Sequence, residues 1–211
     1  MSQDLLIQAD WLASEGYLTV APDLFFGRRM LACIVAVIRE VRARRGRSFD
    51  DIEATREWLA AQDDATGMIA VIGYCMGGGF ALLLAPSGGF AVSSVNYGTA
   101  PKDAYTEGFL DRACPIVGSY GAKDRGMRGA ADRLERALMA AGVEHDLKEY
   151  PEAGHGFLND HEGAGDRVPL LFAVLGRLSG TRYDEASAQD ARRRIIAFFD
   201  AHLKTGTVPR N

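Results

Sequence analysis

The chain has 211 residues, of which 47% are hydrophobic and 25% are charged, and its formal net charge is −4. This length and apolar content are typical of a globular chain that buries a full core, which excludes a disordered or fibrous protein, and they predict a single domain over residues 1–211. The net charge is too small to indicate a strongly acidic or basic partner.

The beginning of the chain predicts an amphipathic helix over residues 2–14. Ser2 is a suitable N-cap, and Gly16 is a suitable stop. Apolar residues recur there with helical spacing and predict the buried face of the helix: Leu5, Ala9 and Leu12.

The rest of the chain alternates between strand and helix patterns. Short apolar or alternating runs predict strands at residues 17–21, 68–74, 90–98, 115–121 and 145–151. Helical patterns occupy residues 29–44, a stretch that begins between 48 and 51, and residues 76–85, 129–141 and 186–204. This alternation predicts an α/β fold with a mostly parallel sheet and helices on both faces. In such a sheet, functional residues gather at the carboxyl ends of the strands.

The chain shows no signal that directs it to a membrane or an oxidising compartment. Its apolar run at residues 30–38 is too short to span a bilayer, and no basic region followed by an apolar one begins the sequence. Cys33, Cys75 and Cys114 lie far apart and form no CxxC pair, which disfavours a disulfide framework or a zinc site. We therefore expect a cytoplasmic protein.

Residues 73–77 read Gly-Tyr-Cys-Met-Gly and form a G-x-C-x-G nucleophile elbow between a strand and a helix. The turn is predicted to hold Cys75 in a strained conformation, and side chains at the flanking glycines to clash. The sulfur would lie at a helix N-terminus, where a thiolate is favoured, and the amide of Met76 would stabilise an oxyanion. The alternatives are a buried structural cysteine and a phosphate-binding loop, although the loop lacks its usual Lys-Ser/Thr pair.

Two further strand ends carry candidate catalytic residues. Asp124 follows the strand at 115–121, and His155 follows the strand at 145–151. With Cys75 they give the order nucleophile, acid, histidine, which α/β-hydrolases use. Taken singly, Asp124 could be a turn residue and His155 a capping or core histidine. The remaining histidines and cysteines have less suitable positions and are predicted to be non-catalytic: His145, His161, His202, Cys33 and Cys114.

Several segments together resemble the dienelactone hydrolase family of α/β-hydrolases over essentially the whole chain: "GYCMGGGFALLLA", "SVNYG", "GAKD", "KEYPEAGHGFLND" and "DARRRIIAFFDAHLK". The resemblance implies hydrolysis of an ester or lactone by a Cys75–His155–Asp124 triad through a thioester intermediate. It also implies a cytosolic enzyme that needs no cofactor. Tyr97 resembles a tyrosine that lines the pocket in this family.

The sequence departs from the family pattern at two places. A strand that ends in His-Glu and supplies the second oxyanion amide normally precedes the first helix, and it is missing here. We therefore expect an N-terminally truncated fold, with a gap or a changed pairing in the sheet. The second place is Asn159, where lactone-cleaving members of the family carry an arginine that binds the substrate's carboxylate. We therefore expect the substrate to be an unspecified ester or lactone rather than a dienelactone.

Two other functional readings remain open. Five arginines between Arg39 and Arg47 could indicate nucleic-acid binding. The acidic run that follows them favours a solvated helix end instead. Cys75 could also belong to an impaired hydrolase or to a thiol sensor without turnover. We expect a monomer or homodimer that acts on a small molecule, with no nucleic acid or membrane partner.

Overall fold

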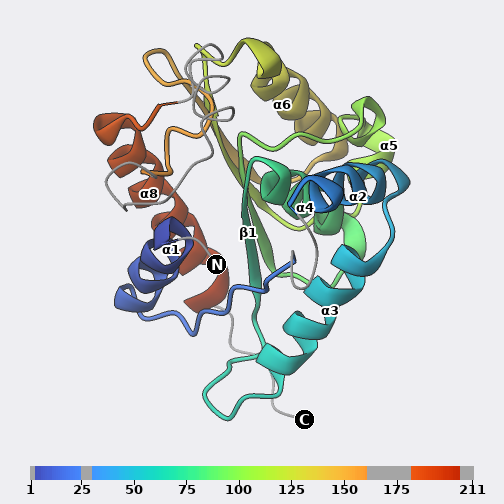
Figure 1. Ribbon diagram of the computed structural model, residues 1–211, viewed down its shortest axis with the longest axis vertical. Coiled ribbons are helices and arrows are strands. Elements are labelled where there is room, and N and C mark those ends of the chain that lie inside the picture. Colours follow the sequence, from blue (N-terminus) through green and yellow to red (C-terminus); the bar gives the residue numbers. More distant parts are fainter. Residues whose placement is uncertain (1–2, 25–29, 161–181, 205–211) are drawn as a thin grey trace.

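The computed structural model describes residues 3–24, 30–160 and 182–204 (Figure 1). Three residues named above lie outside this description: Ser2, His161 and, for its side chain, Cys33.

The centre of the molecule is a sheet of four parallel strands in the order β1-β2-β3-β4. The strands are β1 (Ala70–Tyr74), β2 (Val92–Asn96), β3 (Ile116–Gly121) and β4 (His145–Tyr150). Each one falls within a stretch for which the sequence predicts a strand. The parallel arrangement is therefore confirmed, and all four carboxyl ends lie at the same edge of the sheet.

Helices cover both faces of this sheet, as predicted (Figure 1). The α-helices are α1 (Gln3–Ser14), α2 (Met30–Ala43), α3 (Arg47–Ala60), α4 (Met76–Leu84), α5 (Glu107–Leu110), α6 (Ala130–Ala141) and α8 (Glu185–Phe199), and a π-helical turn follows at Asp200–Lys204. The short helix α5 has no counterpart among the predicted elements.

Separate apolar clusters fill the two spaces between helices and sheet. On one face, Leu12 of α1 and Ile195 and Phe199 of α8 pack against Val92 and Val117 of the central strands. On the other face, side chains of α2, α4 and α6 form a larger cluster with the sheet. Strands β2 and β3 are buried along their whole length, because helices cover them from both sides.

The prediction of a strand at residues 17–21 is wrong. The segment is extended but forms no strand, and no strand in the described parts of the chain pairs with the outer edge of β1. A strand needs a hydrogen-bonded neighbour to satisfy its backbone groups, and none of the described strands pairs with this segment. Most of β1 is only half-buried, in contrast to β2 and β3.

The predicted buried face of the first helix is also wrong in part. Leu12 is buried, but the other buried side chains of α1 are the polar Asp4 and Gln8. Leu5 and Ala9 are only half-buried, and the neighbouring apolar positions 6 and 7 are exposed. Hydrophobic spacing cannot reveal that partners from a loop about 150 residues away satisfy two polar groups on this face.

Candidate active site

Cys75 occupies the sharp turn between β1 and α4. Its backbone has φ 55° and ψ −115°, a conformation that L-residues rarely adopt. The amide of Cys75 donates to the carbonyl of Asn96 at 3.1 Å, and its carbonyl accepts from the amide of Gly79 at 3.1 Å. These bonds hold a strained residue in place, which is typical of functional turns. The thiol is half-buried rather than enclosed.

The two flanking glycines differ in how tightly they are packed. A Cβ atom added at Gly73 would lie 2.0 Å from the carbonyl oxygen of Gly77, so the turn of α4 crosses directly over this position. A Cβ atom at Gly77 would meet nothing within 4 Å. The expectation that both positions exclude side chains is therefore correct for Gly73 and wrong for Gly77, which faces open space.

Asn96 is a supporting residue that the sequence reasoning missed. Besides accepting from the amide of Cys75, it donates from its side-chain amide to the carbonyl of Gly73 at 3.2 Å. It therefore holds both the end of β1 at Gly73 and the backbone of the nucleophile itself. The available signal was its place at the end of β2, in the "SVNYG" segment.

Asp124 and His155 meet at the ends of β3 and β4. The Nδ1 atom of His155 lies 2.6 Å from Oδ2 of Asp124. The other oxygen of Asp124 accepts from the amide of Gly126 at 2.9 Å, and the carboxylate is almost fully buried. The two loops are joined by a backbone bond from the amide of Lys123 to the carbonyl of Ala153, at 2.9 Å. This bond fixes the carboxylate relative to the imidazole.

Besides Asp124, Cys75 acts on the imidazole of His155. Burial by itself lowers the pKa of His155, but hydrogen bonds and charge interactions with Asp124 and Cys75 outweigh it and raise the pKa to about 10. The imidazole is therefore protonated near neutral pH. A protonated ring at this position can give a proton to a leaving group.

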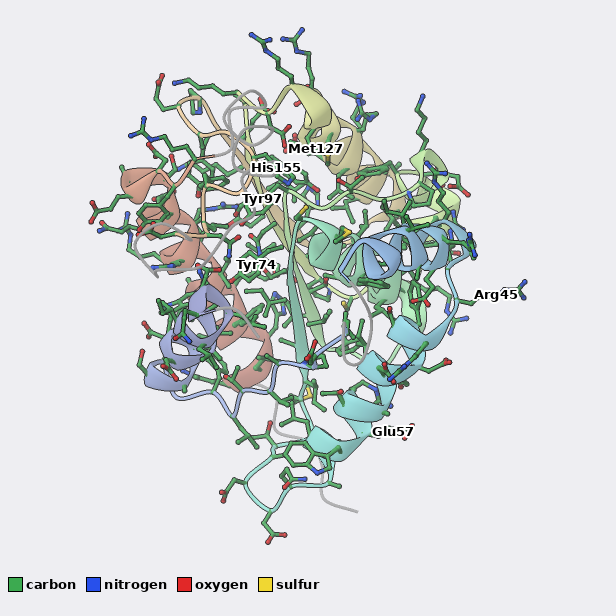
Figure 2. The ribbon with its side chains drawn as sticks, in the orientation of Figure 1. Arg45, Glu57, Tyr74, Tyr97, Met127 and His155 are labelled. Atoms are coloured by element: carbon green, nitrogen blue, oxygen red, sulfur yellow. The ribbon has the colours of Figure 1, made fainter. Side chains whose placement is uncertain are left out.

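Tyr97 lies against the imidazole rather than in an open pocket. It is 1% exposed, and its ring meets that of His155 edge to face, with centroids 5.2 Å apart (Figure 2). Its hydroxyl donates to Oδ1 of Asn159, and burial raises its pKa well above the usual value. Asn159 in turn donates to Oδ2 of Asp4 at 2.5 Å. The two residues predicted to contact substrate are thus bonded to each other.

Met76, the predicted oxyanion donor, is the first residue of α4 and follows the nucleophile directly. The first amides of a helix have no acceptor within the helix and are free to bind an anion. The backbone amide of Met76 therefore has a suitable position beside the sulfur.

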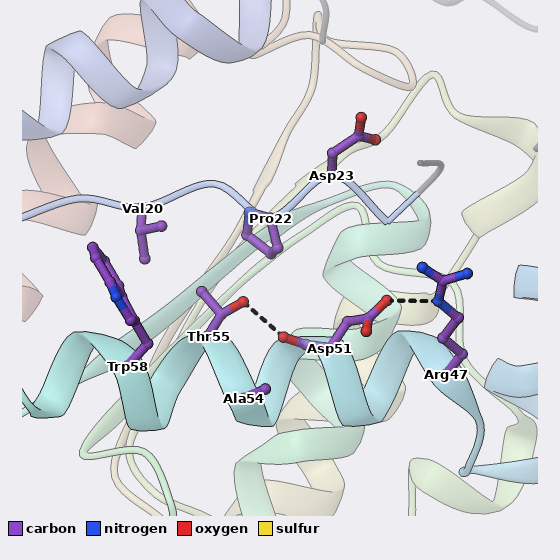
Figure 3. Close-up of a pocket in the computed structure, with 8 residues that line it drawn as sticks. All are labelled: Val20, Pro22, Asp23, Arg47, Asp51, Ala54, Thr55 and Trp58. Carbon is purple, nitrogen blue, oxygen red and sulfur yellow. Dashed lines mark hydrogen bonds and ion pairs between the residues drawn. The ribbon is translucent and has the colours of Figure 1, made fainter. Parts of the chain in front are cut away.

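A groove of about 540 Å³ lies elsewhere, between the extended segment after α1 and helix α3 (Figure 3). Its lining is Val20, Pro22, Asp23, Arg47, Asp51, Ala54, Thr55 and Trp58. Arg47 pairs with Asp51 at 3.2 Å along one side of the groove. The lining does not include Cys75, Asp124 or His155, so this groove is separate from the nucleophile elbow.

The arginine-rich region is partly neutralised by acidic residues. Arg44 pairs with Asp103 and lies over the ring of Phe109, while Arg47 pairs with Asp51. Within the ranges that the structure covers, no helix is long and apolar enough to cross a membrane. The same described ranges contain no group of three histidine, cysteine, aspartate or glutamate side chains arranged around a metal ion.

Known proteins are similar to this chain in sequence and in fold. The carboxymethylenebutenolidase of Rhodococcus opacus is 27% identical over 211 residues, which cover 94% of this chain and 76% of the relative. That of Pseudomonas sp. (strain P51) is 31% identical over 165 residues, or 70% and 65% of the two chains. A Klebsiella pneumoniae structure titled "Putative Dienelactone Hydrolase" superposes with a TM-score of 0.71 at 24% identity, covering 93% of this chain and 80% of that one.

The profile of the "Dienelactone hydrolase family" matches residues 3–203, nearly the whole chain. A second solved structure, the α/β-hydrolase MGS-M1 from a deep-sea metagenome library, shares the fold with a TM-score of 0.56 at 15% identity, over 94% of this chain and 77% of that one. With its parallel sheet and its nucleophile elbow, the chain belongs to the dienelactone hydrolase family of α/β-hydrolases.

Proposed function

We propose that the protein hydrolyses a carboxylic ester or lactone, with Cys75 as nucleophile, His155 as general acid and base, and Asp124 as the residue that orients the imidazole. The observation that carries the proposal is the position of His155: its Nδ1 lies 2.6 Å from the buried carboxylate of Asp124, and an interaction with Cys75 contributes to its raised pKa. This is the relation that nucleophilic catalysis requires among nucleophile, base and orienting group.

In the first step the thiolate of Cys75 attacks the carbonyl carbon and forms a C–S bond. The carbonyl π electrons move to the oxygen, and the resulting oxyanion is stabilised by the amide of Met76. When the intermediate collapses, the C–O bond to the leaving group breaks, and the imidazolium of His155 gives its proton to the departing alkoxide. A thioester and a neutral imidazole remain. In a lactone the alcohol stays attached to the acyl group.

In the second step water cleaves the thioester. Neutral His155 takes a proton from water, whose oxygen attacks the acyl carbon, and the C–S bond breaks to return the thiolate. The carboxylic acid leaves, and the imidazolium again faces the sulfur. Asp124 holds Nδ1 throughout, so that the other ring nitrogen is the one that exchanges the proton.

The proposed substrate class follows from the chemistry of the site and from the names of the relatives. The relatives from Rhodococcus opacus and Pseudomonas are named carboxymethylenebutenolidases, which cleave a lactone ring. In this chain Asn159 bonds with Tyr97 and Asp4, so its polar side-chain atoms are already engaged by the protein. We therefore propose ester or lactone hydrolysis without a requirement for a particular substrate carboxylate.

Hydrolysis of p-nitrophenyl acetate tests the proposal. Wild-type protein and Cys114→Ser should release p-nitrophenol, whereas Cys75→Ala and His155→Ala should not. Cys114 is the matched control because it is another half-buried free thiol, and its burial raises its pKa to about 11. Mass spectrometry of the wild type during turnover should find the acetyl group on Cys75. Full activity in Cys75→Ala would refute the mechanism.

The alternative, a thiol sensor, gives a different result in the same experiment. Iodoacetamide would still label Cys75, because a thiolate next to an imidazolium is reactive. No p-nitrophenol would be released above the level of Cys75→Ala. Labelling with turnover supports the hydrolase, and labelling without turnover supports the sensor.

A further inference from the structure

Helix α1 buries two polar side chains that have no role in the proposed reaction. Asp4 is 3% exposed and Gln8 is 2% exposed, and they lie one helical turn apart. Burying a carboxylate and an amide is costly unless hydrogen bonds satisfy them. Their partners therefore show what this face of the helix is built to hold.

Asp4 binds the end of the loop that carries His155. Its Oδ2 accepts from the side-chain amide of Asn159 at 2.5 Å, and its Oδ1 accepts from the backbone amide of Asp160 at 3.1 Å. A single carboxylate thus fixes two consecutive residues that follow the histidine by four and five positions. Charge-assisted bonds of this kind are the stronger class of hydrogen bond.

Gln8 connects the same loop to the nucleophile elbow. Its Nε2 donates to the carbonyl of Leu158 at 3.0 Å, and its Oε1 accepts from the hydroxyl of Tyr74 at 3.2 Å. Tyr74 directly precedes Cys75. One side chain of α1 therefore joins the loop of the base to the residue before the nucleophile.

Tyr97 completes the link to the imidazole. Its hydroxyl donates to the same Asn159 that Asp4 holds, and its ring packs edge to face against His155 (Figure 2). Tyr97 has φ 39°, which is unusual for a residue with a side chain, so the surrounding contacts must hold it in place. The path from Asp4 to the imidazole thus runs through Asn159 and Tyr97.

We propose that Asp4 and Gln8 are positioning residues that hold the His155 loop against the nucleophile elbow and so set the contact between imidazole and thiol. The proposal rests on the proposed function for its kinetic consequence, but the contact itself can be measured without turnover. Among the described residues, Asp124 and Cys75 act on His155 through hydrogen bonds and charge, and Tyr97 contacts it through its ring. Among the contacts described above, Asp4 reaches His155 through Asn159 and Tyr97.

The test compares Asp4→Ala with Asp10→Ala, which removes an exposed carboxylate from the same helix. The first readout is the pH profile of iodoacetamide alkylation at Cys75, followed by mass spectrometry on protein that circular dichroism shows to be folded. In Asp4→Ala the half-maximal rate should move to higher pH, because a displaced imidazolium stabilises the thiolate less. Asp10→Ala should keep the wild-type profile.

The second readout is the kinetics of ester hydrolysis. In Asp4→Ala, kcat should fall about 10- to 100-fold while KM stays close to its wild-type value, because misplacement of the base affects the chemical step more than binding. A general loss of stability would lower the active fraction but would not move the alkylation profile.

Tyr97→Phe keeps the proposal testable if Asp4→Ala does not fold. It removes only the hydroxyl that bonds Asn159 and keeps the ring against His155, so a smaller shift of the alkylation profile in the same direction is expected. Wild-type profiles in every folded variant, or an equal shift in Asp10→Ala, would overturn the proposal. A wild-type protein without esterase activity would refute the proposed function, while a profile shift in Asp4→Ala would still support the positioning role.

Discussion

Two regions beside strand β1 are built in different ways. The first, here called the catalytic corner, contains the elbow at Cys75 and the loops of Asp124 and His155. Backbone bonds join its loops, and its buried carboxylate, Asp124, is bonded to both Gly126 and His155. The second, here called the β1 flank, contains residues 17–24 and α3. There Leu18, Val20 and Trp58 are 50%, 37% and 56% exposed.

The difference shows where this fold requires exact geometry. In the catalytic corner, backbone segments lie in direct contact. A substitution that adds or removes an atom there therefore creates a clash or breaks a hydrogen bond. In the β1 flank the side chains line an open groove, so changes leave few contacts unsatisfied. Substitutions should therefore have large effects in the corner and small ones in the flank.

The largest effect is expected for Asp124→Asn. The variant keeps the shape and an oxygen for the amide of Gly126 but loses the charge that orients and stabilises the imidazolium of His155. We expect kcat for p-nitrophenyl acetate to fall by about 10³- to 10⁴-fold with little change in KM. Steady-state kinetics measures both, and a loss below tenfold would contradict the role of Asp124.

Gly73→Ala should have the next largest effect, on stability. The new methyl group would meet the backbone of Gly77 at 2.0 Å, which α4 cannot relieve without moving. We expect the free energy of unfolding to fall by about 3 kcal/mol. Urea denaturation measures this change.

Gly77→Ala is the matched control for this clash. Its methyl group would enter open space within a helix, where alanine is favoured over glycine by up to about 1 kcal/mol. Stability should therefore stay the same or rise slightly. An equal loss in both variants would mean that packing around the elbow does not distinguish the two positions.

A smaller effect is expected from pH through His155. Its pKa is about 10 in the folded protein, compared with 6.5 as the ordinary value, so between these pH values the folded state holds a proton that the unfolded state releases. The stabilisation is fully present below pH 6.5 and is lost as the pH rises toward 10. Measurements should stop near pH 9, because half-buried Cys114, with a pKa of about 11, adds its own loss above that value.

His155→Gln isolates this contribution. The difference in unfolding free energy between wild type and variant should shrink from pH 6 to pH 9, as measured by urea denaturation at each pH. A constant difference would show that the folded state does not retain the proton of His155.

The smallest effect is expected for Trp58→Ala in the β1 flank. More than half of this side chain is exposed on the groove, so its loss should change the free energy of unfolding by no more than about 1 kcal/mol. Ester hydrolysis should remain at the wild-type level. A large loss of activity would show that the flank and the catalytic corner are coupled, which would break the comparison between them.

Local patterns were sufficient to predict most of the sheet and the positions of the candidate residues. Each of the four strands is a short apolar or alternating run, and each chemical group follows a strand end, so parallel pairing brings the groups together without further information. The G-x-C-x-G spacing likewise predicted the strained turn at Cys75.

The errors occur where distant parts of the chain decide the outcome. Residues 17–21 have a strand pattern, but strand formation depends on a neighbour and not on the segment itself. Asp4 and Gln8 look like solvent-exposed helix positions until the loop at Leu158 and Asn159 is placed against them. Gly77 matches the elbow motif, which predicts that a side chain there would clash. Only the structure shows that a Cβ atom at this position of α4 would face open space.

The unequal packing of the two elbow glycines has a practical consequence for protein engineering. A mutant library can vary position 77, two residues after Cys75, because a Cβ atom added there would meet no side chain and no neighbouring backbone segment within 4 Å. The same library should leave Gly73 unchanged, because any side chain at position 73 would clash with the backbone of Gly77 and disrupt the turn that holds Cys75. Variation beside the proposed nucleophile is thus compatible with the fold at position 77 but not at position 73.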